Sequence, residues 1–417
     1  MATLTLAERA HFAGWDTRIA KHARRIRLLG PLSWPLSVEA DFFSRPPGQR
    51  RLPDPPAPRF DHDDERRALE EALGALDDGH PIGEFLARTA RSYLAAADML
   101  QAAGSPAFTE RSRRLYGSPR EAIAPGAPTH LEAAEQFLRA SEGCDSVDIN
   151  DGGMPAAEAA AWLQAQLARY FPDPLPVELA PALAAKSTAG ARRVRLRDNT
   201  TYSQRTLAQL LQHEALVHSA TKRNGLAQPL IRCLGLSAPR TTATQEGLAT
   251  LAEMITDTMD LHRLRRIALR ITAIDVALEG GDFFAVFETF TAHGQSEVEA
   301  FRSAARIFRG GDVRGSIVFT KDVVYLKGLM RVHTFLLKAI QSGHRRLPAR
   351  LFAGRMTLHD ALTLEPFFDS GDLTEAVTLP DWVRNVPCLA AYLSWAAFSN
   401  RIPLDKLTLN DFRRDQD

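Results

Sequence analysis

Apolar side chains recur at intervals of three and four residues through most of the chain, which is the pattern of amphipathic helices. Before residue 171, the stretches with this spacing cover residues 5–30, 61–103, 130–140 and 156–170. Alternation of apolar and polar residues, which is typical of strands, is confined to 176–180 and 193–197, with a turn or third strand expected at 186–190. The pattern therefore predicts an α+β protein that is mainly α-helical, with one small sheet.

Two helices are expected directly after these strands. The first runs from about 204 to 223, since hydroxyl side chains at 201–203 can cap its start and Asn224-Gly225 can adopt the left-handed turn that ends a helix. The second runs from about 244 to 266. This order places the small sheet immediately before the first helix, which carries the motif described below.

A stretch rich in proline and arginine at 45–56 resembles a linker or an extended surface strap. The chain of 417 residues is long enough for more than one domain. We therefore expect an N-terminal helical region over residues 1–127, which includes this strap, and a second domain over residues 128–417.

The charge and hydropathy of the chain argue against several classes of protein. Lysine plus arginine (51) nearly balances aspartate plus glutamate (50), so no concentrated basic face is expected and nucleic acid is not a predicted partner. No uninterrupted apolar run reaches the ~18 residues that a membrane-spanning helix needs, and the first residues lack the apolar core of a secretory signal. We expect a cytoplasmic protein without a membrane partner.

The first of the two helices carries the sequence His213-Glu214-Ala215-Leu216-Val217-His218. Catalytic zinc is held by three protein ligands, and metallopeptidases often take two of them from histidines four residues apart on one helix, with a glutamate between them as the base. Here the histidines are five residues apart, so a regular helix would turn them about 140° from each other instead of about 40°. We predict a π-bulge, or an equivalent widened turn, between His213 and His218.

The motif alone leaves two interpretations open. A random chain of this length contains such a pattern in roughly 2% of cases, and His213 and His218 could be a buried and a surface histidine without a metal. Glu246, near the start of the second helix, is the candidate third ligand, because His₂Glu zinc peptidases take a glutamate from a second helix. Gly247 and Ala249 are small and would let this helix approach the metal-binding helix closely. The alternative for Glu246 is a favourable interaction with the positive end of the helix dipole.

Three segments taken together resemble one protein family. They are HEALVH with the TKRNG that follows it, QEGLA at 245–249, and FTKDVVYLKG at 319–328. The combination resembles the QEGLA-motif family, whose bacterial members are described as flavohaemoglobin-expression modulators and which includes the eukaryotic microtubule-associated tyrosine carboxypeptidases. The resemblance extends over residues 130–400.

The resemblance implies that His213, His218 and Glu246 hold Zn²⁺ and that Glu214 is the catalytic glutamate. It implies a zincin-like metallopeptidase core, in which the small sheet precedes the metal-binding helix. It also implies a carboxypeptidase rather than an endopeptidase, so the expected partner is the C-terminus of a peptide or protein, with an aromatic, tyrosine-like terminal residue.

Several polar side chains are candidates for contacts with the substrate. The oxyanion formed during hydrolysis needs a donor besides the metal, and Tyr325 is favoured for this role over Lys321 and Tyr202. A carboxypeptidase must also neutralise the terminal carboxylate of its substrate, for which the candidates are Lys321, Arg314 and Arg331.

Two supporting roles are also expected near the metal helix. The strand at 193–197 could pair with the substrate backbone as an edge strand, unless its arginines simply face solvent. Glu253 lies seven residues after Glu246 on nearly the same helical face, so it could orient a ligand histidine; an exposed position is the alternative.

Two other functions remain open from the sequence. A regulatory or binding protein could keep the metal site without peptidase activity, in which case replacing Glu214 would leave its function intact. A helical scaffold could carry the histidines by coincidence, in which case the protein would hold no metal.

Overall fold

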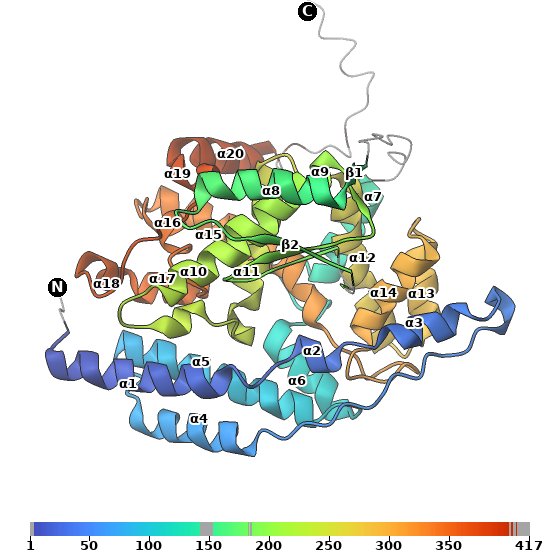
Figure 1. Cartoon of the computed structure of the whole chain (residues 1–417), viewed down its shortest axis with the longest axis horizontal. Coiled ribbons are helices and arrows are strands. Elements are labelled where there is room, and N and C mark those ends of the chain that lie inside the picture. Colours follow the sequence, from blue (N-terminus) through green and yellow to red (C-terminus); the bar gives the residue numbers. More distant parts are fainter. Residues whose placement is uncertain are drawn as a thin grey trace, which may run out of the picture.

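The computed structural model describes residues 4–141, 153–181, 183, 186–399, 402 and 406. Helices make up most of the molecule and two small sheets make up the rest of its regular structure (Figure 1). The predicted class, α+β and mainly α-helical, is confirmed. Among the helices of the described residues, none combines the length and the apolar character needed to cross a bilayer.

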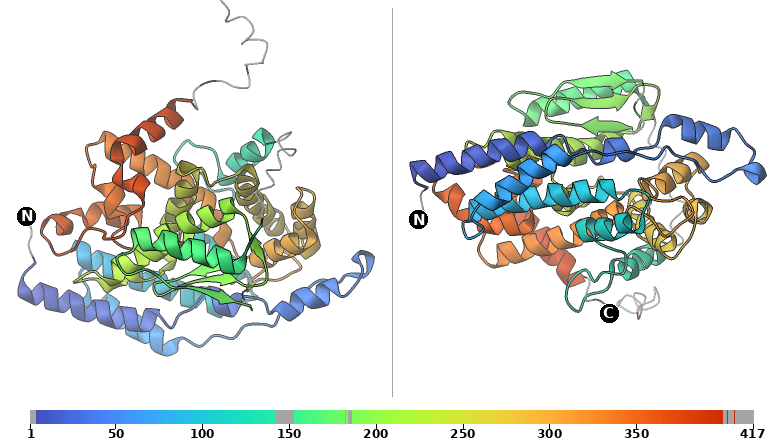
Figure 2. Two further views of the ribbon diagram at one scale, coloured as in Figure 1. Left: turned by 45° about the horizontal axis from the view of Figure 1, so that its top comes forward. Right: turned by 90° about the horizontal axis from the view of Figure 1, so that it is seen from below.

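The N-terminal part is helical, and α1, α4 and α5 lie side by side along one side of the molecule (Figures 1 and 2). A capping box starts α1, where the Thr5 side chain accepts a hydrogen bond from the Glu8 backbone and the Glu8 carboxylate accepts one from Thr5. The elements of this part are α1 (Leu6–Ala23), α2 (Leu29–Leu32), α3 (Leu36–Phe43), η1 (Pro47–Gln49), α4 (Asp63–Ala75), α5 (Pro81–Gln101) and α6 (Pro106–Tyr116).

The proline-rich strap connects α3 to α4 and, apart from the short η1, has no helix or strand. Arg50 anchors it: the guanidinium donates to both carboxylate oxygens of Glu297, at 2.8 and 2.9 Å, and lies over the rings of Phe42 and Phe43. One large hydrophobic core takes side chains from both sides of residue 127. The division into domains 1–127 and 128–417 stays a prediction.

The three-stranded sheet follows α8 in the chain. Together with α8 it forms a separate layer beside the helical body (Figure 2). β4 pairs in parallel with β2 and antiparallel with β3, while β1 and β5 form a two-stranded ribbon. The elements are α7 (His130–Ala140), β1 (Met154–Pro155), α8 (Ala156–Tyr170), β2 (Val177–Ala180), β3 (Ser187–Ala189), β4 (Val194–Arg197) and β5 (Thr201–Tyr202).

Both strands expected from the alternating pattern are present, and the segment left open as a turn or a third strand forms β3, but the expected edge strand is not at an edge. β4, which corresponds to the segment 193–197, is the central strand, and both of its sides are occupied by ladder hydrogen bonds. The suggestion that it pairs with a substrate backbone is therefore wrong. The free edges of this sheet belong to β2 and β3.

One continuous helical rod follows the sheet and comprises α9 (Gln204–Leu210), η2 (Leu211–Ser219) and α10 (Ala220–Leu226). Ser203 caps its start by accepting from the backbone N–H of Thr206. The expected C-cap at Asn224-Gly225 is wrong, because both residues lie inside α10. Asn224 instead anchors the rod by donating to the carbonyls of Phe352 and Thr378, at 2.8 and 2.9 Å. Gly225 is needed for close packing, since a Cβ there would lie 2.2 Å from the Leu234 carbonyl oxygen.

The second predicted helix is in fact two helices, α11 (Thr242–Ile255) and α12 (Leu261–Leu278). The chain turns between them through Asp257, which has a positive φ of 56°, and Asp260 caps the new helix. The remaining elements are η3 (Arg232–Gly235), η4 (Pro239–Thr241), α13 (Phe283–Thr291), α14 (Glu297–Ile307), η5 (Lys321–Val323), α15 (Val324–Gln341), α16 (Leu347–Arg350), α17 (Leu358–Thr363), α18 (Glu365–Asp369), α19 (Asp381–Arg384) and α20 (Val386–Ser399).

Candidate metal centre

The histidine pair lies on a π-helical segment, η2, in the middle of the rod. A π-turn holds more residues than an α-turn, so it brings side chains five positions apart to the same face. His213 and His218 accordingly face each other, with ring centroids 4.8 Å apart and ring planes at 84°. The predicted widening of the helix between the two histidines is confirmed.

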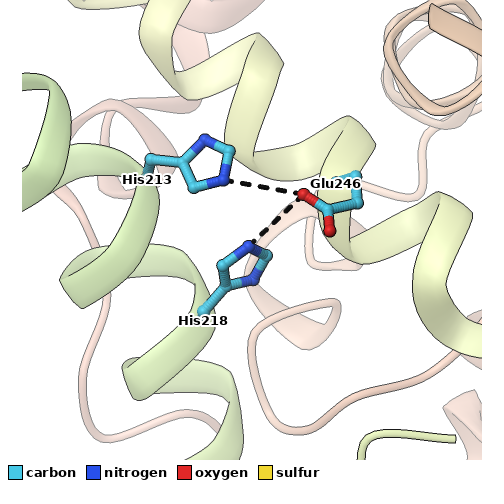
Figure 3. Close-up of side chains that lie close together, drawn as sticks. All are labelled: His213, His218 and Glu246. Atoms are coloured by element: carbon cyan, nitrogen blue, oxygen red, sulfur yellow. Dashed lines mark ion pairs between the residues drawn. The ribbon is translucent and has the colours of Figure 1, made fainter. Parts of the chain in front are cut away.

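Glu246 of α11 completes a group of three side chains whose candidate ligand atoms all lie within 4.8 Å of one another (Figure 3). Its Oε2 atom lies 3.6 Å from Nε2 of His213 and 3.6 Å from Nε2 of His218. These distances are too long for ordinary hydrogen bonds. They are close to the ligand–ligand separation of about 3.4 Å that follows from zinc–ligand bonds of about 2.05 Å in a tetrahedral site.

The burial of Glu246 supports the same assignment. Its Oε2 atom is buried and has no hydrogen-bond partner among the described residues, although a buried carboxylate oxygen normally has one. Two imidazole nitrogens and a carboxylate oxygen are a donor set that zinc favours. The residues present therefore fit a bound metal ion.

Two glycines determine where Glu246 lies. A Cβ on Gly247 would lie 2.3 Å from the carbonyl oxygen of Gly328, and one on Gly328 would lie 2.1 Å from the carbonyl oxygen of Ala243, so α11 and α15 cross at van der Waals contact. The sequence suggested that Gly247 allows a close approach to the metal helix, whereas the close approach is to α15. The metal helix is joined to α11 by a hydrogen bond of 2.8 Å from Thr221 to Gln245.

Glu253, in the last turn of α11, orients the first histidine. Its Oε1 atom lies 2.5 Å from Nδ1 of His213, which leaves Nε2 of that ring facing Glu246. Gln209 and Arg263 also donate to the Glu253 carboxylate, at 2.9 and 3.1 Å, and the side chain is fully buried. Burial raises the pKa of Glu253, but Arg263 and His213 outweigh it and lower the pKa to about 2. Glu253 is therefore a buried anion beside a candidate ligand histidine.

Negative charge surrounds the two rings. Burial lowers the pKa of His213, but its interactions with Glu246 and Glu253 raise it to about 10. For Glu246, burial raises the pKa, while Lys321 and the two histidines together hold it well below its usual value. The pocket thus stabilises positive charge between these side chains, which a metal cation would supply.

A cleft of about 980 Å³ opens onto the centre and is lined by Glu214, His218, Glu246 and Lys321. The Lys321 ammonium lies 3.4 Å from Oε1 of Glu246. Glu214 is half-buried, and no hydrogen bond or ion pair ties it to another residue in the described part of the chain. Its carboxylate is therefore free to act on a molecule bound in the cleft.

The structure does not bring the remaining predicted substrate contacts into this lining. Tyr202 is a buried residue of β5, and its hydroxyl shares its one proton between the backbone carbonyls of Lys186 and Arg197, at 2.8 and 2.9 Å. Arg314 is a surface residue paired with Asp312, and Arg331 is exposed on α15. Each of these side chains has a polar group that could bind a substrate, but the packing of its segment turns that group away from the cleft.

Tyr325 occupies a cationic pocket directly behind the centre. The charged groups of Arg270, Lys321 and Arg263 lie 5.2, 5.5 and 5.9 Å from the centre of its ring. Its side chain is buried and is not among those that line the cleft. The oxyanion role assigned to Tyr325 stays a prediction.

The cleft lining includes side chains that the sequence did not single out. One of them, Lys222 of α10, lies in the TKRNG segment four residues after His218. Distant parts of the chain contribute the others, so neither spacing nor a motif links those to the histidines. They are Tyr93 of α5, Tyr116 of α6, Arg355 after α16, and Ala23, Arg24 and residues 26–29 between the end of α1 and the start of α2.

Comparison with known proteins agrees with this geometry. No individual curated protein matches the chain. The sequence profile of the microtubule-associated tyrosine carboxypeptidase family matches residues 40–401, which include the metal centre and most of the cleft lining but not the cleft-lining residues between positions 23 and 29. The chain therefore belongs to the microtubule-associated tyrosine carboxypeptidase family.

Proposed function

We propose that this protein is a zinc-dependent carboxypeptidase that removes an aromatic, tyrosine-like residue from the C-terminus of a peptide or protein. The observation that carries the proposal is the convergence of His213, His218 and Glu246, with the Oε2 atom of Glu246 at its centre, for which the described residues offer no hydrogen-bond partner. Family membership supports the carboxypeptidase reaction. The two-histidine helix, the glutamate on a second helix and the preceding sheet support the proposal of a zincin-like core.

Zinc held by these three residues would polarise the scissile carbonyl and lower the pKa of a bound water molecule towards about 7. Glu214 then acts as the general base, because its carboxylate lines the cleft and has no competing partner among the described residues. The same carboxyl group returns the proton to the departing amine. Removal of a single terminal residue follows from family membership rather than from the ligands.

Two cations complete the electrostatics of the centre. Lys321 keeps Glu246 ionised from the cleft side and is the predicted basic residue that remains next to the substrate. Arg263 keeps Glu253 ionised from the interior, and Glu253 in turn fixes the His213 ring. One cation therefore stabilises the charge of Glu246 from the cleft, and the other stabilises the charge of Glu253 from the interior.

Metal analysis and a peptide assay with a Glu214 variant test this proposal. Elemental analysis should give one zinc per chain for the wild type and for Glu214→Gln. Mass spectrometry of peptides ending in tyrosine should show loss of that residue with the wild type, and a fall in kcat of about 10²–10⁴-fold in the variant. Glu110→Gln, at an exposed position on α6, is the matched control and should behave as the wild type.

Other results would identify the alternatives. Bound zinc without trimming of any C-terminus would favour a regulatory or binding protein that retains a metal site. Absence of zinc from a folded preparation would contradict the metal centre itself.

A further inference from the structure

Arg355 lies in the turn between α16 and α17, and its backbone is held in place. The Arg355 N–H donates to the carbonyl of Leu234, at 2.6 Å. The neighbouring Gly354 is packed so tightly on Leu234 that a Cβ there would lie 2.7 Å from the Leu234 Cβ. The side chain therefore starts from a fixed position on η3 and extends into the cleft wall.

The guanidinium of Arg355 is bound only by neutral groups. Nη2 donates to the backbone carbonyl of the ligand residue His218, at 2.8 Å, and Nη1 donates to the hydroxyl of Ser237. Nε is buried without a hydrogen-bond partner, and no carboxylate of the described residues forms an ion pair with the side chain. Each terminal nitrogen carries two N–H groups, so each has one left for a ligand.

This arrangement sets Arg355 apart from Lys321, which lines the same cleft. The Lys321 ammonium is already paired with Glu246, whereas the Arg355 charge has no anionic partner in the described structure. The side chain is half-buried, and a charge that is partly removed from water is costly unless it is paired. A bound anion would remove this cost.

We propose that Arg355 binds the terminal carboxylate of the substrate and so restricts the enzyme to free C-termini. The planar guanidinium matches a carboxylate through two parallel hydrogen bonds, which a lysine cannot provide. Because Nη2 is attached to the backbone of His218, the carboxylate is held at a fixed place relative to the metal ligands. This inference rests on the proposed function and names the residue that gives the reaction its exopeptidase character.

Binding and trimming are measured separately, so that the two proposals can fail independently. The binding probe is a fluorescent peptide ending in tyrosine, used with a free carboxylate and with a C-terminal amide. Its affinity is measured by anisotropy for zinc-loaded Glu214→Gln, alone and combined with Arg355→Gln or Arg355→Lys. Arg67→Gln, 71% exposed on α4, is the matched control. Trimming of the free-acid peptide is followed with Glu214 intact.

The free acid should bind about a hundredfold more tightly than the amide when Arg355 is present. Arg355→Gln should reduce that ratio to near one by weakening the acid alone, and Arg355→Lys should restore only part of it. A purely structural role for Arg355 would weaken acid and amide equally, and that result would overturn the inference. An unchanged ratio in Arg355→Gln, or equal binding of acid and amide by the parent, would also overturn it. Absence of trimming by the wild type, with the binding ratio as expected, would contradict the proposed function only.

Discussion

The carboxylate of Glu253 lies 2.5 Å from Nδ1 of His213, and this contact determines which ring nitrogen faces the metal centre. Glu253→Gln keeps the shape of the side chain but removes its charge. We expect zinc affinity to fall about 10–100-fold, because carboxylates behind ligand histidines contribute effects of this size. Competition with a chromogenic chelator measures the change. Arg263→Lys, which keeps a positive charge beside Glu253, should cause a smaller loss; equal affinity of Glu253→Gln and the wild type would contradict the role.

The close crossing of α11 and α15 predicts that adding a single methyl group at Gly247 destabilises the fold. Gly247→Ala places a methyl group where the Gly328 carbonyl lies, so the helices must separate, and we expect a loss of about 1–3 kcal/mol in the free energy of unfolding. Zinc affinity should fall as well, since Glu246 is the adjacent residue. Gly74→Ala in α4 is the control: its added Cβ meets no atom within 4 Å, and the substitution should stabilise by about 0.5–1 kcal/mol. Thermal and chemical unfolding check both values.

Two tyrosines are candidates for the oxyanion donor, and a pair of phenylalanine variants distinguishes them. Tyr116 lines the cleft near Lys321, whereas Tyr325 is packed behind the centre. We expect Tyr116→Phe to lower kcat by about 10²-fold with little change in KM, as loss of one oxyanion donor does. Tyr325→Phe should retain most of the activity. The reverse ranking in steady-state assays would restore Tyr325 to the role that the sequence suggested.

The burial of His130 predicts that the free energy of unfolding depends on pH in a way that is unrelated to the metal. The side chain is fully buried and neither ring nitrogen has a described hydrogen-bond partner; burial, with a smaller effect from Lys327, lowers the pKa of His130 from 6.5 to about 4. Between these values the unfolded chain binds the proton and the folded chain does not. This contribution to stability is therefore constant above pH 6.5 and is lost as the pH falls towards 4.

The free energy of unfolding of the wild type and of His130→Leu, measured by denaturation at pH 7 and pH 5, isolates this contribution. The wild type should lose about 2 kcal/mol more than the variant over this interval, because each unit of pH corresponds to about 1.4 kcal/mol for one proton. Parallel losses in the two proteins would show that the histidine titrates normally in the folded state.

Local patterns were sufficient for much of the fold. The spacing of apolar residues placed α7 and α8 at the residues where the structure has them, and alternation located β2 and β4. The five-residue spacing of His213 and His218 was enough to predict a widened helix, because only that geometry turns both rings to one side. In these cases the information lies within a few neighbouring residues.

The errors arose where the partner is distant in the sequence. Asn224 and Gly225 have the composition of a helix end, but contacts with residues beyond position 230 keep them helical. Gly247 allows a close approach to Gly328 rather than to the metal helix, although both glycines lie in recognised motifs. Arg355 and Tyr116 follow no pattern at all, since only the folded chain brings them to the cleft.

The widened turn also affects how this motif could have arisen. Removing one residue between the histidines would give the common four-residue spacing, and the widened turn would become an α-turn that still keeps both rings on one side. The extra residue is absorbed within η2, so the rest of the rod would keep its register and Asn224 would keep the carbonyls of Phe352 and Thr378. A single insertion or deletion could therefore convert one zinc motif into the other while the anchor of the rod stays in place.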